Sequence, residues 1–224
     1  MSARVYLPRD VAALAVGADE VAQALTAAAQ RRGVTLEIIR TGSRGLFWLE
    51  PMLEVATSDG RVAYGPVEAS DAEALLDAIV AGGGPHRLRL GPTEAISFLK
   101  RQTRLTFARC GIIDPLSLQD YRAAGGYRGL ERALTLGPAA IVEAVVESGL
   151  RGRGGAGFPT GIKWRTTREA VGQPKYIVCN ADEGDSGTYA DRMIMEGDPF
   201  CLVEGMTIAA IAVGAAKGFL YIRS

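Results

Sequence analysis

The strongest chemical signature in this sequence is a glycine-rich loop at residues 151–164, which reads RGRGGAGFPTGIKW. Five of the ten residues from 152 to 161 are glycine, and Arg151, Arg153 and Lys163 add positive charge. Glycine tolerates positive φ and has no Cβ, so consecutive backbone N–H groups can point at one bound anion. The loop is therefore expected to hold the phosphate of a nucleotide.

Two familiar phosphate loops do not fit these residues. The Gly-Lys-Ser/Thr ending of a P-loop is absent, and the segment before the loop is predicted to be a helix where a Rossmann fingerprint requires a strand. A flexible linker is the remaining alternative. The aromatic residues Phe158 and Trp164 and the flanking cations argue against it, because linkers are rich in serine and poor in aromatic residues.

A second segment of opposite character follows at residues 180–188, with the sequence NADEGDSGT. It comes directly after Lys175–Cys179, which is predicted to be a buried strand, and open α/β sheets bind ligands at the carboxyl ends of their strands. Its amide and carboxylate oxygens can accept hydrogen bonds from sugar hydroxyls and a heterocycle, whereas they would repel phosphates. A cofactor loop is the preferred interpretation. A solvated turn and a calcium loop are the alternatives, although EF-hand spacing is absent.

The N-terminal part is predicted to be a small α/β domain over residues 1–82. A Ser70/Glu73 capping box is expected to start its last helix, and Gly82–Pro85 is expected to form a linker. The Asp59-Gly60 dipeptide indicates a hairpin turn, and Gly33 is expected to end the first helix. The predicted elements are the strand Val5–Leu7, a helix beginning near Asp19, the strand Val34–Arg40, the hairpin strands Leu53–Thr57 and Val62–Tyr64, and the helix that carries Leu75, Leu76, Ile79 and Val80.

The rest of the chain is predicted to contain a connecting arm over 83–137 and a second α/β domain over 138–224. In the arm, Leu88–Leu90 and Leu105–Phe107 are weak strand candidates, and a helix is expected after Pro115. In the second domain, Pro138 is expected to open a helix over Ala139–Ser148. A helix over Phe200–Val213 and a strand over Phe219–Arg223 then complete a strand-helix-strand unit.

Composition excludes several classes of partner. Lys plus Arg and Asp plus Glu both number 25, so no net charge attracts nucleic acid or an anionic membrane. The three cysteines fit neither a disulfide framework nor a Cys-only metal site, and the first residues do not form a signal peptide. The longest apolar run, Met206–Ala216, is about half the length of a membrane-spanning helix. A cytoplasmic protein without nucleic-acid binding or membrane insertion is expected.

The two loops together resemble a known family. Residues 147–164, ESGLRGRGGAGFPTGIKW, and then Asn180-Ala181-Asp182-Glu183 are similar to the FMN- and NADH-binding subunit of respiratory complex I. The variant DEGDSGT at 182–188 looks most like the beta subunit of soluble NAD-dependent molybdenum formate dehydrogenase. The diaphorase subunit of NAD-reducing hydrogenase is close behind. The resemblance covers nearly the whole chain from Arg4 onward.

The resemblance implies FMN and NAD(H) as cofactors and an α/β, Rossmann-like FMN/NADH-binding domain that begins in this chain. It implies catalytic roles for Glu183 and Lys163, and stacking of Phe158 on the nicotinamide nucleotide. Asp185 would meet the nicotinamide ribose. The cofactor-binding residues that it implies are Gly152, Arg153, Gly154, Gly155, Ala156, Gly157, Phe158, Lys163, Asn180, Asp182, Glu183 and Asp185.

The resemblance also implies that the N-terminal domain is a thioredoxin-like [2Fe–2S] ferredoxin domain that has lost its cluster. Pro8, Ala13, Ser43 and Phe47 stand at the four ligand positions, so no cluster and no other metal is expected in this chain. The family's [4Fe–4S] segment is expected beyond Ser224. The domain is interpreted as a degenerate docking module.

The function implied is that of a diaphorase subunit, which passes electrons between NAD(H), FMN and iron–sulfur clusters of a multi-subunit formate dehydrogenase. Its partners would be a thioredoxin-like [2Fe–2S] small subunit and a large catalytic iron–sulfur/molybdenum subunit. The same module in NAD-reducing hydrogenase or complex I is the alternative within this class. From another class, a non-catalytic docking scaffold remains open.

Overall fold

A computed structural model describes residues 2–185 and 187–223 of the chain. The chain divides into two compact units, each described here by itself. Unit 1 comprises Met1–Tyr121 and Met193–Asp198, and unit 2 comprises Arg122–Arg192 and Pro199–Ser224.

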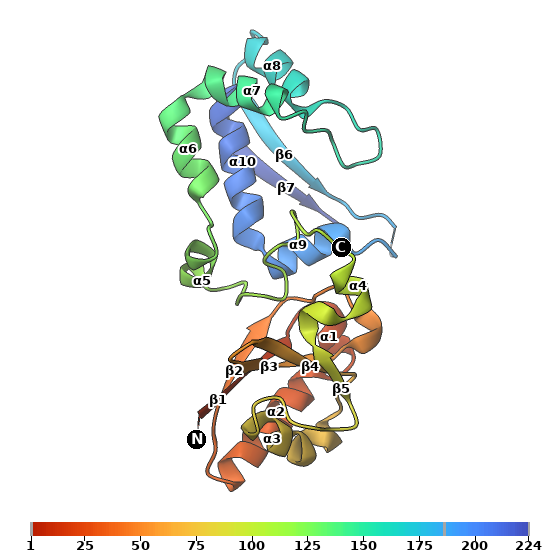
Figure 1. The fold of residues 1–224 in the computed structure, drawn as a ribbon. Helices are drawn as coiled ribbons and strands as arrows, with labels where there is room; N and C mark the ends of the chain where they lie inside the picture. Colours follow the sequence, from red (N-terminus) through yellow and green to blue (C-terminus); the bar gives the residue numbers. More distant parts are fainter. Residues whose placement is uncertain (1, 186, 224) are drawn as a thin grey trace. The chain divides into compact units, whose positions relative to one another are not determined.

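Unit 1 is built on a five-stranded sheet with the order β2-β1-β3-β4-β5 (Figure 1). The strand β1 is parallel to β2 and antiparallel to β3, and β4 is antiparallel to both β3 and β5. The Asp59-Gly60 turn joins β3 and β4 as the sequence predicts, with Gly60 at φ 124°. The strands are β1 (Ser2–Pro8), β2 (Thr35–Thr41), β3 (Leu53–Thr57), β4 (Gly60–Tyr64) and β5 (Arg89–Pro92).

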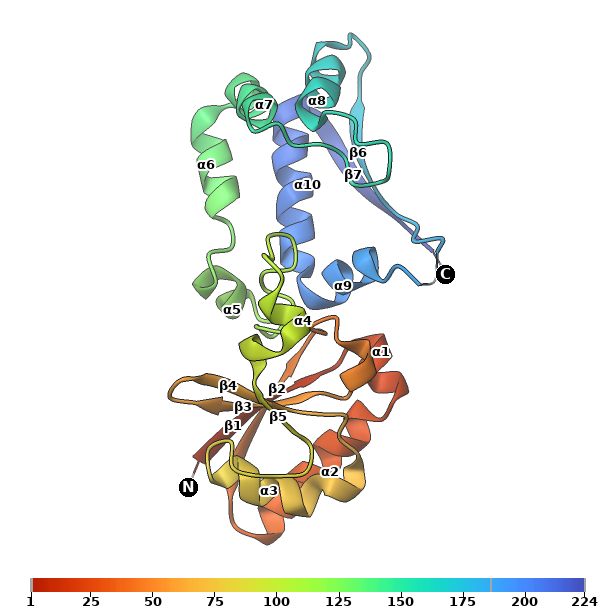
Figure 2. The same ribbon diagram turned by 45° about the vertical axis from the view of Figure 1, so that its right-hand side comes forward.

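Two helices, α2 (Ala18–Arg31) and α3 (Ala72–Val80), cover one face of this sheet (Figure 2). Their apolar stripes close the core with strand residues that alternate inward, and Val5, Leu25, Leu53 and Leu75 are fully buried there. A parallel strand-helix-strand unit followed by an antiparallel hairpin and a helix is the thioredoxin-like arrangement, so the predicted fold of this domain is confirmed. The shorter helical elements are α1 (Val11–Ala15), η1 (Phe47–Leu49), η2 (Ala69–Asp71), η3 (Thr93–Ala95), α4 (Ser97–Lys100) and α5 (Leu118–Ala123).

Two local predictions in this part of the chain are wrong. The capping box before α3 is formed by Glu68 and Asp71 and not by Ser70 and Glu73, because a turn of 3-10 helix starts the element earlier. The backbone N–H of Glu68 donates to Asp71 at 3.0 Å. Residues Leu105–Phe107 form turns and no strand, and Leu105 is 85% exposed, so nothing buries the apolar side that a strand would need.

Partly buried arginines connect residues 104–112 to the sheet of unit 1. Arg61 donates to the carbonyl oxygens of Gly111 and Ile112 at 3.0 and 2.6 Å. Arg104 donates to the carbonyl of Arg44, whose own guanidinium makes a buried two-bond contact with Glu54 at 3.0 and 2.8 Å. The sheet itself continues beyond residue 82, since β5 adds its fifth strand at 89–92.

Unit 2 contains a two-stranded parallel sheet, β6 (Lys175–Ala181) and β7 (Ala215–Ile222), joined by a helical crossover. The helix α10 (Pro199–Val213) packs Ala212 and Val213 against Ile141 and Val142 to form the core. This is the strand-helix-strand unit that the sequence predicts. The other helices of unit 2 are α6 (Arg128–Leu136), α7 (Pro138–Glu147) and α8 (Thr160–Glu169), while α9 (Ala190–Gly197) begins in unit 2 and continues in the segment assigned to unit 1. The helices α6, α8 and α9 were not expected.

The outer face of β6 is exposed, which corrects the prediction of a buried strand. Tyr176 and Val178 are 51% and 63% exposed, whereas Ile177 packs into the core. The described helices cover only one side of this two-stranded sheet, so alternate residues face solvent. None of the described helices combines the length and apolar character that a membrane crossing requires.

Candidate functional site

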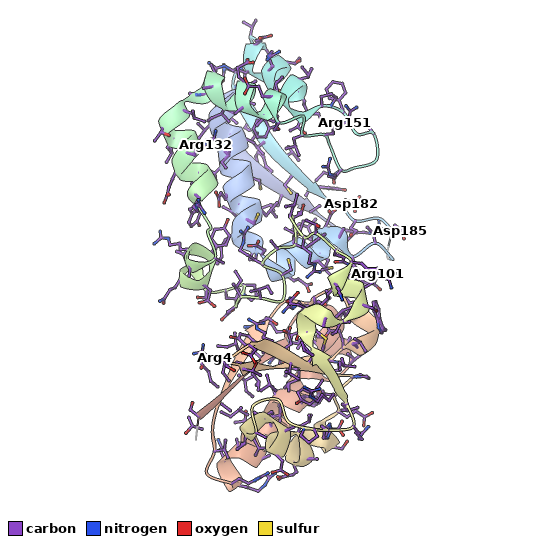
Figure 3. All side chains as sticks on the ribbon, in the orientation of Figure 1. Arg4, Arg101, Arg132, Arg151, Asp182 and Asp185 are labelled. Carbon is purple, nitrogen blue, oxygen red and sulfur yellow. The ribbon has the colours of Figure 1, made fainter. Side chains whose placement is uncertain are left out.

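The glycine loop is closed at its base by backbone hydrogen bonds. Arg151 and Pro159 form an antiparallel bridge, and Gly152 N–H donates to the Phe158 carbonyl at 2.8 Å. Thr160 N–H donates to the Leu150 carbonyl at 2.9 Å, and α8 begins at Thr160. The turns between these bonds therefore project from unit 2 as an ordered loop, with Arg151 at the base (Figure 3).

Glycine is favoured at the positions of this loop for different structural reasons. A Cβ on Gly161 would lie 2.5–2.7 Å from atoms of Val146, so this glycine allows α8 to approach α7 closely. Gly155 and Gly157 have φ of 102° and 61°, a conformation that side chains disfavour. Gly154 has nothing within 4 Å of its Cβ position. The tip of the loop, unlike Gly161, thus presents bare backbone to open space.

The cations of the loop are available to a ligand. Arg151, Arg153 and Lys163 are exposed, and none of them is within ion-pair distance of a carboxylate in the described residues. The guanidinium of Arg153 donates to the Arg151 carbonyl, so the Arg153 side chain folds back over the loop. Phe158 is 52% exposed at the end of the loop. Positive charge, bare backbone and one aromatic ring thus share this surface.

The acidic loop begins where β6 ends, as the sequence predicts. Asn180 is the last but one residue of the strand, and its Oδ1 accepts from Asp182 N–H at 3.2 Å. The Asp185 Oδ1 accepts from Gly187 N–H at 3.1 Å. These short-range bonds keep Asp182 and Asp185 at the surface beyond the end of β6 (Figure 3).

Glu183 has a local structural role in this loop. Its two carboxylate oxygens accept from the backbone N–H groups of Asp191 and Arg192 at 3.0 and 3.2 Å, which are among the first residues of α9. A carboxylate at a helix N-terminus satisfies otherwise unbonded N–H groups and opposes the helix dipole. Burial, and to a lesser extent the neighbouring Glu183 charge, raise the pKa of Asp191.

Both loops of unit 2 lie near β6: the glycine loop, between α7 and α8, runs beside this strand, and the acidic loop follows its carboxyl end in both views (Figures 1 and 2). Among the described residues, no hydrogen bond or ion pair joins 151–163 to 180–188. The convergence of the two loops on one nucleotide stays a prediction, as do the individual roles assigned to their residues.

Ser43, one of the four positions at which the resemblance would place a cluster ligand, belongs to a buried hydrogen-bond network. The Ser43 hydroxyl donates to Glu50 Oε1 at 2.7 Å and accepts from Gly45 N–H at 2.9 Å. The other Glu50 oxygen accepts from Met52 N–H at 2.9 Å. Burial raises the pKa of Glu50 to about 7, with smaller contributions from Asp10 and Glu54. Within residues 2–185 and 187–223, no three His, Cys, Asp or Glu side chains are grouped to hold a metal ion.

Sequence reasoning missed one charged residue at the acidic loop. Arg223 follows β7, and its Nη1 lies 3.7 Å from Asp182 Oδ1. The signal was available in principle, because both residues follow directly the aligned strand ends Ala181 and Ile222. Finding it required knowing that β6 and β7 are adjacent and in this register.

Comparison with known proteins gives a match to one family model in the C-terminal part of the chain. Residues 145–224 match the Nuo51 FMN-binding domain. Over 107 residues the chain is 57% identical to an NADH-quinone oxidoreductase subunit of Rhizobium meliloti, covering 47% of this chain and 25% of that protein. Over 125 residues it is 53% identical to the NADP-reducing hydrogenase subunit HndC of Solidesulfovibrio fructosivorans, covering 56% and 25%.

One relative matches both units. The chain is 34% identical over 239 residues to the alpha subunit of the NAD-reducing hydrogenase HoxS of Cupriavidus necator, covering 98% of this chain and 36% of that subunit. A crystal structure of an NAD+-reducing [NiFe]-hydrogenase is 30% identical with a TM-score of 0.44, covering 99% of this chain and 36% of that one. The chain thus spans between a quarter and about a third of the length of these curated relatives.

Proposed function

Because residues 145–224 form the start of a Nuo51 FMN-binding domain, we propose that this chain is part of a diaphorase subunit, which exchanges electrons between NAD(H) and FMN. The observation that supports this most directly is the glycine loop. Its open backbone around Gly154 and its three exposed cations suit a phosphate, and they lie within the segment that the family model matches.

The residues present fit FMN by their chemistry. Gly154, Gly155, Ala156 and Gly157 would bring backbone N–H groups to the phosphate, and Arg153 and Lys163 would balance its charge. Gly152, whose N–H is bonded to the Phe158 carbonyl, would line the flavin without donating to it. Phe158 would stack on a ring of the nicotinamide nucleotide.

The acidic loop would bind the other parts of the cofactors. Asn180, Asp182 and Glu183 would accept hydrogen bonds from hydroxyl and ring N–H groups of FMN, and Asp185 would contact the nicotinamide ribose. FMN supplies the capacity to take two electrons from NADH and release them one at a time. The contribution of these residues is to hold and orient both cofactors.

The distant substrate of the assembly is a separate proposal. The relatives that match all or about half of this chain are subunits of hydrogenases and of NADH-quinone oxidoreductase. They favour a module that serves hydrogen or quinone chemistry over formate dehydrogenase. The formate assignment rests on the sequence DEGDSGT at 182–188 alone. A [2Fe–2S] thioredoxin-like subunit, a large catalytic subunit and a [4Fe–4S] cluster would complete either assembly.

Unit 1 supports a second candidate function of a different class, a docking scaffold. Ser43, which stands where the resemblance would place a thiolate, instead donates to Glu50, and this favours a unit that docks over one that carries a cluster. A scaffold role for the whole chain would require that unit 2 binds no flavin.

Flavin binding tests the proposal and separates the two candidates. The intact protein is expected to be yellow, to release FMN on denaturation and to reduce a dye with NADH. The double variant Arg153→Gln/Lys163→Gln should bind FMN at least tenfold more weakly, because it removes two of the three exposed cations of the loop. Arg132→Gln, an exposed cation on α6 of the same unit (Figure 3), is the matched control.

A colourless protein that associates tightly with its partners and reduces no dye would favour the scaffold. Unchanged FMN affinity in the double variant would show that the glycine loop does not hold the phosphate.

A further inference from the structure

The end of β7 places a cation beside the acidic loop. β6 and β7 are parallel and in register up to the pair Ala181 and Ile222, so the next residues, Asp182 and Arg223, leave the sheet side by side. Arg223 Nη1 is 3.7 Å from Asp182 Oδ1. No other described cation lies within ion-pair distance of a carboxylate in this loop.

Neighbouring residues leave room for this pairing. A Cβ on Gly184 would lie 3.2 Å from Arg223 Nη1, so a glycine at this position keeps the guanidinium unobstructed. Glu183 is already bonded to the start of α9, and Asp185 accepts from Gly187 N–H. Asp182 is therefore the carboxylate of the loop whose charge is balanced by a side chain.

We propose that Arg223 is a positioning residue for flavin binding, which holds the Asp182 carboxylate turned toward the hydroxyl and ring groups of FMN. The inference rests on the proposed function, since it concerns the same site. Arg223 acts through Asp182 and does not itself contact the FMN phosphate, for which the glycine loop supplies the cations. Replacing Arg223 should then weaken binding of any flavin that uses Asp182.

The pair is exposed enough that its effect on folding is small. The side chains of Arg223 and Asp182 are 58% and 35% exposed, and surface ion pairs contribute little to stability. A change in flavin affinity at constant stability would thus report on positioning.

The experiment measures binding of FMN and of riboflavin, which lacks the phosphate, to the intact protein after removal of its flavin, by quenching of flavin fluorescence. Arg223→Gln is expected to weaken both ligands by a similar factor of about ten, the loss of one charge-assisted contact. Arg223→Lys should recover part of the affinity. In an Asp182→Asn background, Arg223→Gln should have no further effect. Lys217→Gln removes the same charge from β7 at a site that instead faces Phe219, and should leave affinity unchanged.

Weakened FMN binding with unchanged riboflavin binding would mean that Arg223 contacts the phosphate, which overturns the inference. An undiminished effect of Arg223→Gln in the Asp182→Asn background, or no effect in the parent protein, would overturn it as well. If the parent protein binds neither flavin, the proposed function fails and the inference fails with it.

Discussion

The buried Glu50 carboxyl should make the stability of unit 1 depend on pH. Burial raises its pKa from 4.5 to about 7 in the folded state, with Ser43 and Met52 donating to its oxygens. Each pKa unit corresponds to about 1.4 kcal/mol, so the folded state favours the protonated form by about 3 kcal/mol. Because the folded-state pKa is raised, the contribution of protonated Glu50 to the stability of the folded state is complete below pH 4.5. It is lost as the pH rises through about 7.

Substitution of Glu50 by glutamine isolates this effect. The carbonyl of the introduced amide can accept from Met52 N–H and its NH2 can donate to the Ser43 hydroxyl, which imitates the protonated acid. Relative to the parent protein, Glu50→Gln should therefore gain stability as the pH rises. Most of the difference of about 3 kcal/mol should appear between about pH 5 and pH 8.

The assay is urea unfolding at several pH values, followed by the fluorescence of Trp48 of unit 1 in a Trp164→Phe background. Glu20→Gln removes an exposed carboxylate of α2 and should give a pH profile parallel to that of the parent. A difference between Glu50→Gln and parent that is constant over this pH range would refute the reasoning, because the carboxyl would then titrate equally in both states.

Three further predictions concern unit 2, each measured as a change in the free energy of unfolding and the first with a control substitution. Gly161→Ala should destabilise the protein by about 1–3 kcal/mol, because the added Cβ would lie 2.6 Å from the backbone of Val146. The control Gly205→Ala on α10 places its Cβ in open space and should stabilise by up to about 1 kcal/mol. Equal effects of the two substitutions would contradict the close approach of α7 and α8. Gly155→Ala should cost about 1–2 kcal/mol from its φ of 102° alone, which a neutral result would exclude. Glu204→Ala should cost about 2 kcal/mol, because it leaves the N–H groups of Tyr127 and Leu130 without their acceptor, and a loss well below about 1 kcal/mol would mean that water replaces it.

Local signals in the sequence were sufficient for most elements of unit 1. Asp59-Gly60 has one dominant use, a tight hairpin turn, and the structure places β3 and β4 on either side of it. Gly33, at φ 64°, lies just after the end of α2. In both cases a backbone requirement that few residues meet stands next to a clear apolar pattern.

Signals failed where the outcome depends on contacts between distant residues. Leu105–Phe107 has the composition of a strand, but Arg104 ties this segment to the Arg44 carbonyl, and no strand edge in the described part of the chain pairs with it. The outer face of β6 is another example. Its apolar composition indicated burial on both sides, whereas the described sheet has helices on only one.

The sequence predicted which residues make up the candidate site, but not the structural role of each one. The sequence groups Gly161 with the ligand-facing glycines, yet its reason is helix packing. It groups Glu183 with the cofactor contacts, yet both of its oxygens already bond the start of α9. Such roles depend on atoms that only the fold brings near.

This double engagement of Glu183 changes how its substitution must be interpreted. Glutamine has one acceptor where the start of α9 needs two, so Glu183→Gln would disturb the helix start even if the carboxylate never touched FMN. A loss of flavin binding in that variant alone therefore identifies no contact. Asp182 is the more informative position, because its ion pair with Arg223 is exposed and stands apart from the start of α9. Comparing the two positions separates binding by the acidic loop from the folding of the loop itself.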